Sequence, residues 1–210
     1  SWVGSSLQIV PGDPRTKSDY FQTPHIERLA ALGMSFAQGY APAASCCPTR
    51  RSIQIGQTPA RHEYNKDRKG WTDTYRKQLN IPRLLKFVDS RYQCAHFGKW
   101  DHRYDEVTPE QQGFDTSDGA TGNGEGGSKG SGGPAARNDP KLVNAISDRA
   151  IAFIRENTKK GTPFYLQVSH YAVHLDIYYQ KKTLKKMQQI DAGKKHTMPE
   201  FAAMTSDMDT

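Results

Sequence analysis

Residues 45–56 read SCCPTRRSIQIG, so that two adjacent cysteines, Cys46 and Cys47, directly precede a proline, a threonine and two arginines. A zinc site usually draws four ligands from two CxxC-like pairs, and only Cys94 and scattered histidines remain to complete one. A disulfide between neighbouring residues would be strained. A buried structural thiol is the third interpretation of the pair, and a functional nucleophile is the fourth.

The nucleophile interpretation has a physical basis in the residues that follow the pair. Pro48 and Thr49 favour a helix start, which would place Cys46 just before a helix N-terminus. The helix dipole and the two arginines would stabilise negative charge there. A site that stabilises an anionic nucleophile also favours an anionic substrate.

The elements that must position this segment follow from hydrophobic periodicity, proline and glycine. Helices are predicted at 24–32, 48–56, 82–89, 140–157, 179–190 and 198–209, and strands at 34–41, 92–100 and 162–174. Thr23 and Asp139 are the expected N-caps of the first and fourth helices. Helices and strands alternate with connections too long for hairpins, which predicts an α/β sheet with helices on its faces.

Polar and charged side chains stand where two of the predicted strands end. The strand predicted at 92–100 ends in HFGKW at 96–100, and the strand predicted at 162–174 ends in VSHYAVH at 168–174. In open α/β sheets, sites lie at the carboxyl ends of the strands. Cys94, inside the strand predicted at 92–100, is interpreted as a core residue.

Composition limits the classes of partner. The chain has 210 residues, enough for one domain or a large piece of one, and a formal net charge of +7. Lysines crowd residues 181–195, which indicates either an anionic partner or a solvated helix face. Neither zinc-finger spacing nor basic residues interleaved with aromatics is present, so no nucleic-acid partner is expected. No apolar run approaches the roughly 20 residues of a membrane span.

Residues 116–134 form a glycine-rich segment, TSDGATGNGEGGSKGSGGP. Its glycine content predicts a loop over a surface or a site, within a single partial domain that covers 1–210. No GxGxxG dinucleotide pattern fits, because no strand leads directly into the segment and no helix directly follows it.

The motif CCPTR at 46–50 matches the Cys-x-Pro-Ser/Thr-Arg motif of the type I sulfatases, in which the first cysteine is oxidised to formylglycine. The surrounding segment 23–61 resembles the family's N-terminal pattern. Three later segments, 83–100, 163–174 and 200–210, resemble family blocks in the same order. The chain therefore resembles this family over residues 18–210, and the resemblance implies the fold of the alkaline phosphatase superfamily, here incomplete.

The resemblance also implies roles for individual residues. Cys46 would be the formylglycine precursor and Arg50 would hold the hydrated aldehyde. Lys99 would contact the sulfate, and His174 would hydrogen-bond the sulfate or assist the leaving group. The alternatives are a surface charge for Arg50, a solvated loop lysine for Lys99 and a structural histidine for His174.

A hydrated aldehyde suits the chemistry of a sulfate ester, because it carries two hydroxyl groups on one carbon. One hydroxyl attacks sulfur and releases the alcohol, and the other then loses its proton so that the carbonyl reforms and expels sulfate. Charge on the sulfate oxygens must be offset, which explains the need for basic side chains and a divalent cation.

The sequence departs from the family pattern directly after the lysine. The family usually reads Lys-Trp-His, whereas this chain reads Lys99-Trp100-Asp101, with His102 one place later. Asp101 could accept a hydrogen bond from the hydrate, or His102 could reach in from the loop; we favour Asp101 near the site.

The expected calcium site is incomplete as well. The family binds Ca²⁺ through an aspartate pair near the first strand and an Asp-Asn pair near the end of the domain, and neither pair is present. Only the formylglycine derived from Cys46 would remain from that ligand set, whereas calcium takes about six to eight oxygen ligands. We expect an internal fragment, truncated at both ends and inactive in isolation.

Three functions remain open at this point. The first is hydrolysis of sulfate monoesters on a sulfated small molecule or glycan, with a formylglycine-generating enzyme as a further partner. The second is hydrolysis of phosphonate or phosphate esters within the same superfamily. The third is non-catalytic binding of polyanions. By resemblance, the location is secreted, periplasmic or lysosomal.

Overall fold

The computed structural model describes residues 17–36, 38–62, 64, 75–102, 106–126, 138–174 and 176–210. The chain divides into two compact units. The sheet unit comprises residues 41–126 and 144–171, and the helical unit comprises residues 1–40, 127–143 and 172–210. Each unit is described by itself.

The sheet unit is built on three parallel strands, β1 (Gln93–Gly98), β2 (Thr116–Ser117) and β3 (Phe164–Ser169), in the order β2-β1-β3. Ala95 of β1 pairs with Thr116 of β2 and with Leu166 of β3. Because all strands are parallel, their carboxyl ends lie at one edge of the sheet, and Lys99 follows β1 directly at that edge. The predicted α/β architecture is confirmed. β2 occupies the first two residues of the glycine-rich segment 116–134, and residues 127–134 lie outside the described residues.

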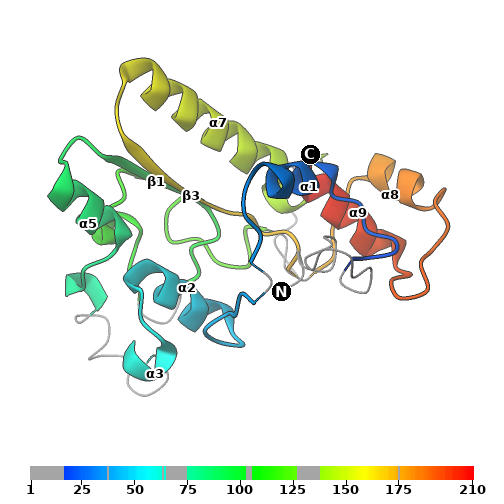
Figure 1. The fold of residues 1–210 in the computed structure, drawn as a ribbon, viewed down its shortest axis with the longest axis horizontal. Coiled ribbons are helices and arrows are strands. Elements are labelled where there is room, and N and C mark those ends of the chain that lie inside the picture. The colour runs from blue at the N-terminus through cyan, green and yellow to red at the C-terminus, as the bar shows by residue number, and fades with distance from the viewer. Residues whose placement is uncertain are drawn as a thin grey trace. The chain divides into compact units, whose positions relative to one another are not determined.

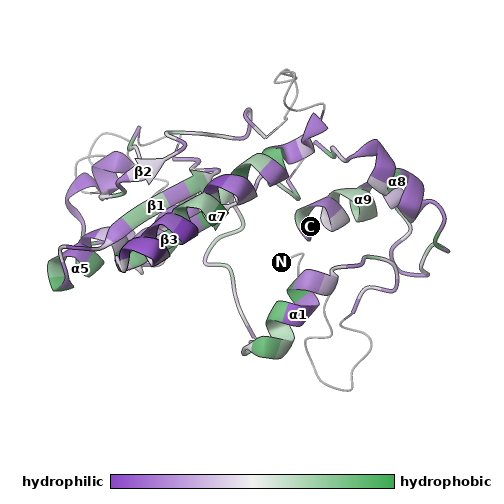
Figure 2. Cartoon of the chain, turned by 90° about the horizontal axis from the view of Figure 1, so that it is seen from above, coloured by the Kyte–Doolittle hydropathy of each residue, from purple (hydrophilic) through white to green (hydrophobic). Residues whose placement is uncertain are grey.

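Helix α7 (Val143–Lys160) covers one face of the sheet. It is amphipathic, and hydrophobic and hydrophilic residues alternate along it in Figure 2. Its buried residues recur at helical spacing, namely Val143, Ile146, Ala150, Phe153 and Asn157. The Phe153 ring packs edge-on against Phe97 of β1, with ring centroids 6.2 Å apart.

Helix α2 (Cys46–Ile55) covers the opposite face, so β1 and β3 run between α7 and α2 in Figure 1. The amide of Gln54 on α2 donates to Oε1 of Gln167 on β3 at 2.6 Å. Gln167 pairs with His96 in the register, so both side chains point toward α2 rather than α7. The predicted helix at 48–56 therefore exists, begins at Cys46 and ends before Gly56, whose φ of 65° suits the left-handed C-cap position.

Shorter helices of the sheet unit include α3 (Pro59–His62), α5 (Ile81–Val88) and the 3₁₀ helix η3 (Glu110–Gln112). The side chain of Asn80 caps α5 by accepting a hydrogen bond from the amide of Arg83 at 3.0 Å. The same side chain donates to the Gln112 carbonyl and to Gln112 Oε1, which ties α5 to the loop before β2.

The helical unit contains α1 (Pro24–Leu32), the 3₁₀ helix η4 (Pro140–Leu142), α8 (Lys181–Met187) and α9 (Pro199–Met208). Its buried core consists of Tyr20, Phe21, Met187, Ala202 and Ala203. The Asp209 carboxylate accepts hydrogen bonds from the amides of His25 and Ile26 at 2.9 and 2.8 Å. Asp209 thus satisfies the α1 N-terminus, and the predicted cap Thr23 forms no side-chain cap hydrogen bond.

Two further sequence predictions are corrected by the structure. The strand expected at 34–41 is absent from its described residues, where Met34 and Phe36 are exposed and no neighbouring strand pairs with them. Asp139 was expected to cap the longest helix. Lys141 and Leu142 instead adopt left-handed φ values of 64° and 53°, so α7 starts only at Val143. Among the described helices, none is long and apolar enough to cross a membrane.

His96 lies at the centre of the sheet unit and is fully buried. Its ring packs edge-on against Trp100 and Phe114, at centroid distances of 5.0 and 5.7 Å. Neither ring nitrogen has a hydrogen-bond partner among the described residues. Burial lowers the pKa of His96 to about 3, and the positive charge of Arg50 acts in the same direction.

We expect this buried histidine to make stability dependent on pH. Between the usual histidine pKa near 6.5 and the folded value of about 3, the unfolded chain binds a proton at this ring that the folded chain does not. The free energy of unfolding should therefore fall by about 1.4 kcal/mol per pH unit as the pH decreases through this window. Urea unfolding at pH 7 to 4 should show this slope as the difference between the native chain and His96→Phe. Equal slopes for both proteins would contradict a neutral buried His96.

Candidate active site

Cys46 and Cys47 are the first two residues of α2. Ser45 before them is extended, and the hydroxyl of Thr49 donates to the Ala43 carbonyl at 3.0 Å, which fixes the chain as it enters the helix. Cys46 is partly exposed, whereas Cys47 is buried beside Tyr64. The positive end of the α2 dipole therefore lies at this segment, where it favours a negatively charged group.

The loop that follows β1 brings Lys99 and Asp101 together. The Lys99 amide donates to the Ser169 carbonyl at 2.7 Å, which extends the β1–β3 pairing by one residue beyond the strand. Lys99 Nζ lies 3.2 Å from an Asp101 carboxylate oxygen, and both side chains are almost completely buried. Lys99 is therefore not the solvated loop lysine of the alternative interpretation. Asp101 has a φ of 57°, a left-handed conformation that a non-glycine residue rarely adopts.

Arg50 joins α2 to this loop. Its Nη1 donates to the main-chain carbonyl of Lys99. Burial lowers the pKa of Arg50, and the negative charge of Asp101, Cys46 and Cys47 opposes that shift. Arg50 and Lys99 thus lie close together, and the negative charge of Asp101 acts on both.

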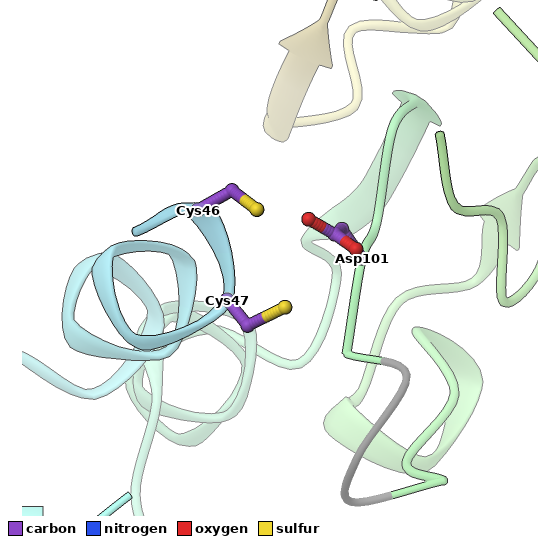
Figure 3. Close-up of side chains that lie close together, drawn as sticks. All are labelled: Cys46, Cys47 and Asp101. Carbon is purple, nitrogen blue, oxygen red and sulfur yellow. The ribbon is translucent and has the colours of Figure 1, made fainter. Parts of the chain in front are cut away.

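Cys46, Cys47 and Asp101 converge on one small volume. One ligand atom from each, the two Sγ atoms and a carboxylate oxygen, lie within 4.8 Å of one another. Figure 3 shows the two sulfurs at the start of α2 pointing toward the Asp101 carboxylate across from the helix. The structure therefore places Asp101, which departs from the family pattern, directly opposite Cys46.

His102 lies in a different environment from Asp101. Its ring stacks on Trp100 at a centroid distance of 4.3 Å and on Tyr75 at 5.2 Å. The Arg51 guanidinium covers the Tyr75 ring at 4.4 Å. The four side chains form a buried stack that connects α2 to the loop after β1. His102 packs within this stack, which supports Asp101 rather than His102 as the residue beside Cys46.

Thr121 was not anticipated from the sequence, although it shapes the site. Its hydroxyl donates to the Gly98 carbonyl at 2.5 Å and accepts from the Trp100 amide at 3.0 Å. Its carbonyl accepts from the Asp101 amide at 2.7 Å. A threonine within a glycine-rich segment carries no sequence signal of this role, because the contact depends on where the loop folds back.

His174 belongs to the helical unit, whereas the other predicted site residues belong to the sheet unit, namely Cys46, Arg50, Lys99, Asp101 and His102. The His174 side chain is exposed. Its predicted contact with sulfate therefore stays a prediction. Cys94 is fully buried in β1, where burial raises its pKa to about 11, as the core interpretation requires.

A comparison with protein families now bears on this arrangement. The model of the family named Sulfatase matches residues 10–210, nearly the whole chain. The chain belongs to the sulfatase family.

The names of two curated relatives describe sulfatases that act on carbohydrates. An N-acetylglucosamine-6-O-sulfatase of Bacteroides thetaiotaomicron is 32% identical over 164 residues, which cover 73% of this chain and 26% of that protein. A ulvan-active sulfatase of Formosa agariphila is 29% identical over 119 residues, 54% of this chain and 21% of that protein.

Solved structures agree on the fold. A protein in complex with its substrate, D-glucosamine-2-N,6-O-disulfate, superposes with a TM-score of 0.58 and 24% identity, over 84% of this chain and 35% of that chain. This likeness shows that the chain shares its fold with that protein. The chain spans about a quarter of the length of the curated relatives named above.

Proposed function

We propose that this sulfatase chain carries part of the active site of a sulfuric ester hydrolase that cleaves sulfate monoesters of carbohydrates, with Cys46 as the precursor of a formylglycine nucleophile. The observation that carries the proposal is the placement of Cys46 at the N-terminus of α2, opposite Asp101, beside the joined pair of Arg50 and Lys99. These residues come from two segments that are about 50 positions apart, and the sheet brings them together.

The surroundings of Cys46 fit an aldehyde at that position. The side chain is partly exposed, so a modifying enzyme or a substrate can approach it. When present, a hydrated aldehyde supplies an oxygen nucleophile and a means of releasing sulfate without attack by water on sulfur. A helix N-terminus and a neighbouring guanidinium are the environment that stabilises the negative charge of such a nucleophile.

The basic side chains then have distinct tasks. Arg50, whose guanidinium is held by the Lys99 carbonyl, offsets negative charge at position 46. The Lys99 ammonium is buried and fixed by Asp101, so it is preorganised to offset charge on the sulfate oxygens or on the leaving oxygen. Little reorganisation is needed at the moment of reaction, because both cations are already held by protein groups.

Asp101 is the residue in this cluster that can accept a proton. Its carboxylate faces position 46 and is held by Lys99, while its amide is anchored on the Thr121 carbonyl. We assign Asp101 the task of accepting a hydrogen bond from position 46, which the family usually gives to a histidine. His102 packs in the aromatic stack with Trp100 and Tyr75 and thereby supports the loop that follows β1.

The described residues do not fit a calcium ion. The cluster offers one carboxylate group and two sulfurs, whereas Ca²⁺ takes about six to eight oxygen ligands. Calcium binding in the complete protein therefore needs oxygen ligands beyond this cluster.

The choice of a sulfated carbohydrate as substrate rests on the relatives, two of which bear the names of carbohydrate sulfatases. A formylglycine-generating enzyme is the partner that conversion of Cys46 requires. A secreted, periplasmic or lysosomal location stays part of the proposal.

The modification is tested by the mass of the tryptic peptide Leu29–Arg50, taken from protein made in its native host or together with a formylglycine-generating enzyme. We expect fragmentation of this peptide to place an aldehyde at position 46 and an alkylatable thiol at Cys47. An intact thiol at Cys46 under these conditions would leave a non-catalytic, anion-binding relative as the better function. In the complete protein, faster turnover of an aryl phosphate than of an aryl sulfate would favour a phosphate-ester hydrolase instead.

A further inference from the structure

We propose that, before any conversion of Cys46, the two sulfurs and the Asp101 carboxylate form a binding site for a thiophilic divalent cation such as Zn²⁺. This inference is independent of the sulfatase proposal, because it concerns the chain with both thiols intact and is tested by metal binding alone. It gives Cys47, which the proposed reaction does not use, a chemical role.

The arrangement of ligand atoms supports such a site. Within the described residues, Cys46, Cys47 and Asp101 form a group whose three ligand atoms lie within 4.8 Å of one another. Zinc binds cysteine sulfur at about 2.3 Å and carboxylate oxygen at about 2.0–2.2 Å in a tetrahedron, which requires these ligand atoms to lie roughly 3.5–3.8 Å apart. Small side-chain rotations of the two cysteines would close the remaining distance, since their Sγ atoms already point toward the carboxylate (Figure 3).

The type of ligand decides which metal the group prefers. Two sulfurs and one carboxylate oxygen are a poor set for calcium or magnesium, which prefer oxygen ligands only. Thiolates favour zinc and other thiophilic ions, and three protein ligands leave one tetrahedral position for water or a small ligand. None of the three cysteines is disulfide-bonded.

The surroundings hold the ligands in place. Cys47 and Asp101 are buried and Cys46 is partly exposed, so a cation can reach the group from the Cys46 side. Lys99 contacts the Asp101 carboxylate at 3.2 Å, and the Asp101 amide is bound to the Thr121 carbonyl, which orients this ligand from outside the group.

The basic side chains beside the group limit its affinity for a divalent metal ion. Lys99 and Arg50 carry positive charge toward the group and oppose the arrival of a divalent ion. We therefore expect weaker binding than at a site of four cysteines. Conversion of Cys46 to formylglycine would remove one of the two sulfurs, so thiophilic metal binding and conversion exclude each other at this residue.

Cobalt provides the experiment, because Co²⁺ bound to thiolate absorbs strongly in the near ultraviolet and its visible spectrum distinguishes tetrahedral from octahedral coordination. The reduced 210-residue chain, made without a formylglycine-generating enzyme, is titrated with Co²⁺ and then with Zn²⁺. We expect one equivalent of tetrahedral Co²⁺ with thiolate absorption, and displacement of it by Zn²⁺. Octahedral Co²⁺ without thiolate absorption would overturn the proposal.

Variants assign the ligands. Cys46→Ser and Cys47→Ser should each lose about half of the thiolate absorption and bind at least about tenfold more weakly. Asp101→Asn should keep the absorption of two thiolates but also bind at least about tenfold more weakly. Cys94→Ala is the matched control, since Cys94 is buried in β1 outside the group, and it should bind as the native chain does. Unchanged binding by Cys47→Ser, or loss of absorption in Cys94→Ala with an unchanged circular dichroism spectrum, would refute the assignment.

Discussion

Replacing Cys46 by alanine should reduce sulfate-ester turnover by the complete protein at least about a thousandfold, because it removes the atom from which the nucleophile is made. The remaining basic groups, Arg50 and Lys99, would still bind an anion, so substrate affinity should change much less than kcat. The measurement compares kcat and KM of the native protein and the variant with an aryl sulfate, after coexpression with a formylglycine-generating enzyme.

The control for this experiment is Cys94→Ala. Cys94 is the other cysteine outside the pair, it is fully buried in β1, and its thiol has a pKa of about 11, so it cannot supply a nucleophile near neutral pH. We expect this variant to keep kcat within about tenfold of the native value. If Cys46→Ala also kept kcat within that range, the nucleophile would lie elsewhere and the formylglycine proposal would be wrong.

Much of the sheet unit could be predicted from the sequence, because its elements carry local signals. Proline near the start of α2 and α5, together with Gly56 after the end of α2, delimits these helices to within two residues, and the alternation of helices and strands gives the α/β class. The position of Lys99 just beyond β1 follows from the strand itself. The expectation that the cysteine motif and this lysine share one site came from the resemblance to the sulfatases, because no local signal links the two segments.

The sequence favoured Asp101 over His102 as the residue beside Cys46, but it could not decide between them. Two neighbouring residues in a loop point in different directions, and the direction depends on backbone dihedrals that tertiary contacts impose. Here Thr121 and Lys99 hold Asp101 in a left-handed conformation facing Cys46, while Trp100 and Tyr75 enclose the His102 ring. Thr121 and Tyr75 are distant from the loop in sequence, so no local pattern could indicate these contacts.

The helix caps were missed for a similar reason. Thr23 is a good cap by residue type, yet Asp209, at the far end of the chain, binds the same amides. Asp139 is followed by two left-handed residues, which no propensity would predict for lysine and leucine. Local preference is worth only about 1 kcal/mol at a cap, so a long-range contact can override it.

Replacing Gly98 by alanine should cause one of the largest losses of stability that a single substitution can produce in the sheet unit. A Cβ atom at Gly98 would lie 2.2 Å from the carbonyl oxygen of Ser169 and 2.8 Å from its carbonyl carbon. Both are backbone atoms of the neighbouring strand and cannot move aside as a flexible side chain would. Gly98 also has a φ of 94°, which alanine adopts only with strain. We expect the free energy of unfolding to fall by about 3–5 kcal/mol.

The variant Gly119→Ala separates the cost of the steric clash at Gly98 from the cost of the strained backbone. Gly119 has a similar φ of 82°, but a Cβ there would meet no atom within 4 Å. This variant should lose only about 1–2 kcal/mol, the cost of the left-handed backbone alone. Urea unfolding of the native chain and both variants measures the two losses under the same conditions.

The close approach at Gly98 also determines where Lys99 lies. The same Ser169 carbonyl that a Cβ would strike accepts the hydrogen bond from the Lys99 amide at 2.7 Å. An alanine at position 98 must push β1 and β3 apart at their carboxyl ends, and this displaces Lys99 relative to Arg50, whose guanidinium holds the Lys99 carbonyl. Equal losses of stability for Gly98→Ala and Gly119→Ala would show that the strands can separate there at little cost, and that the backbone contact at Gly98 does not fix the lysine in the site.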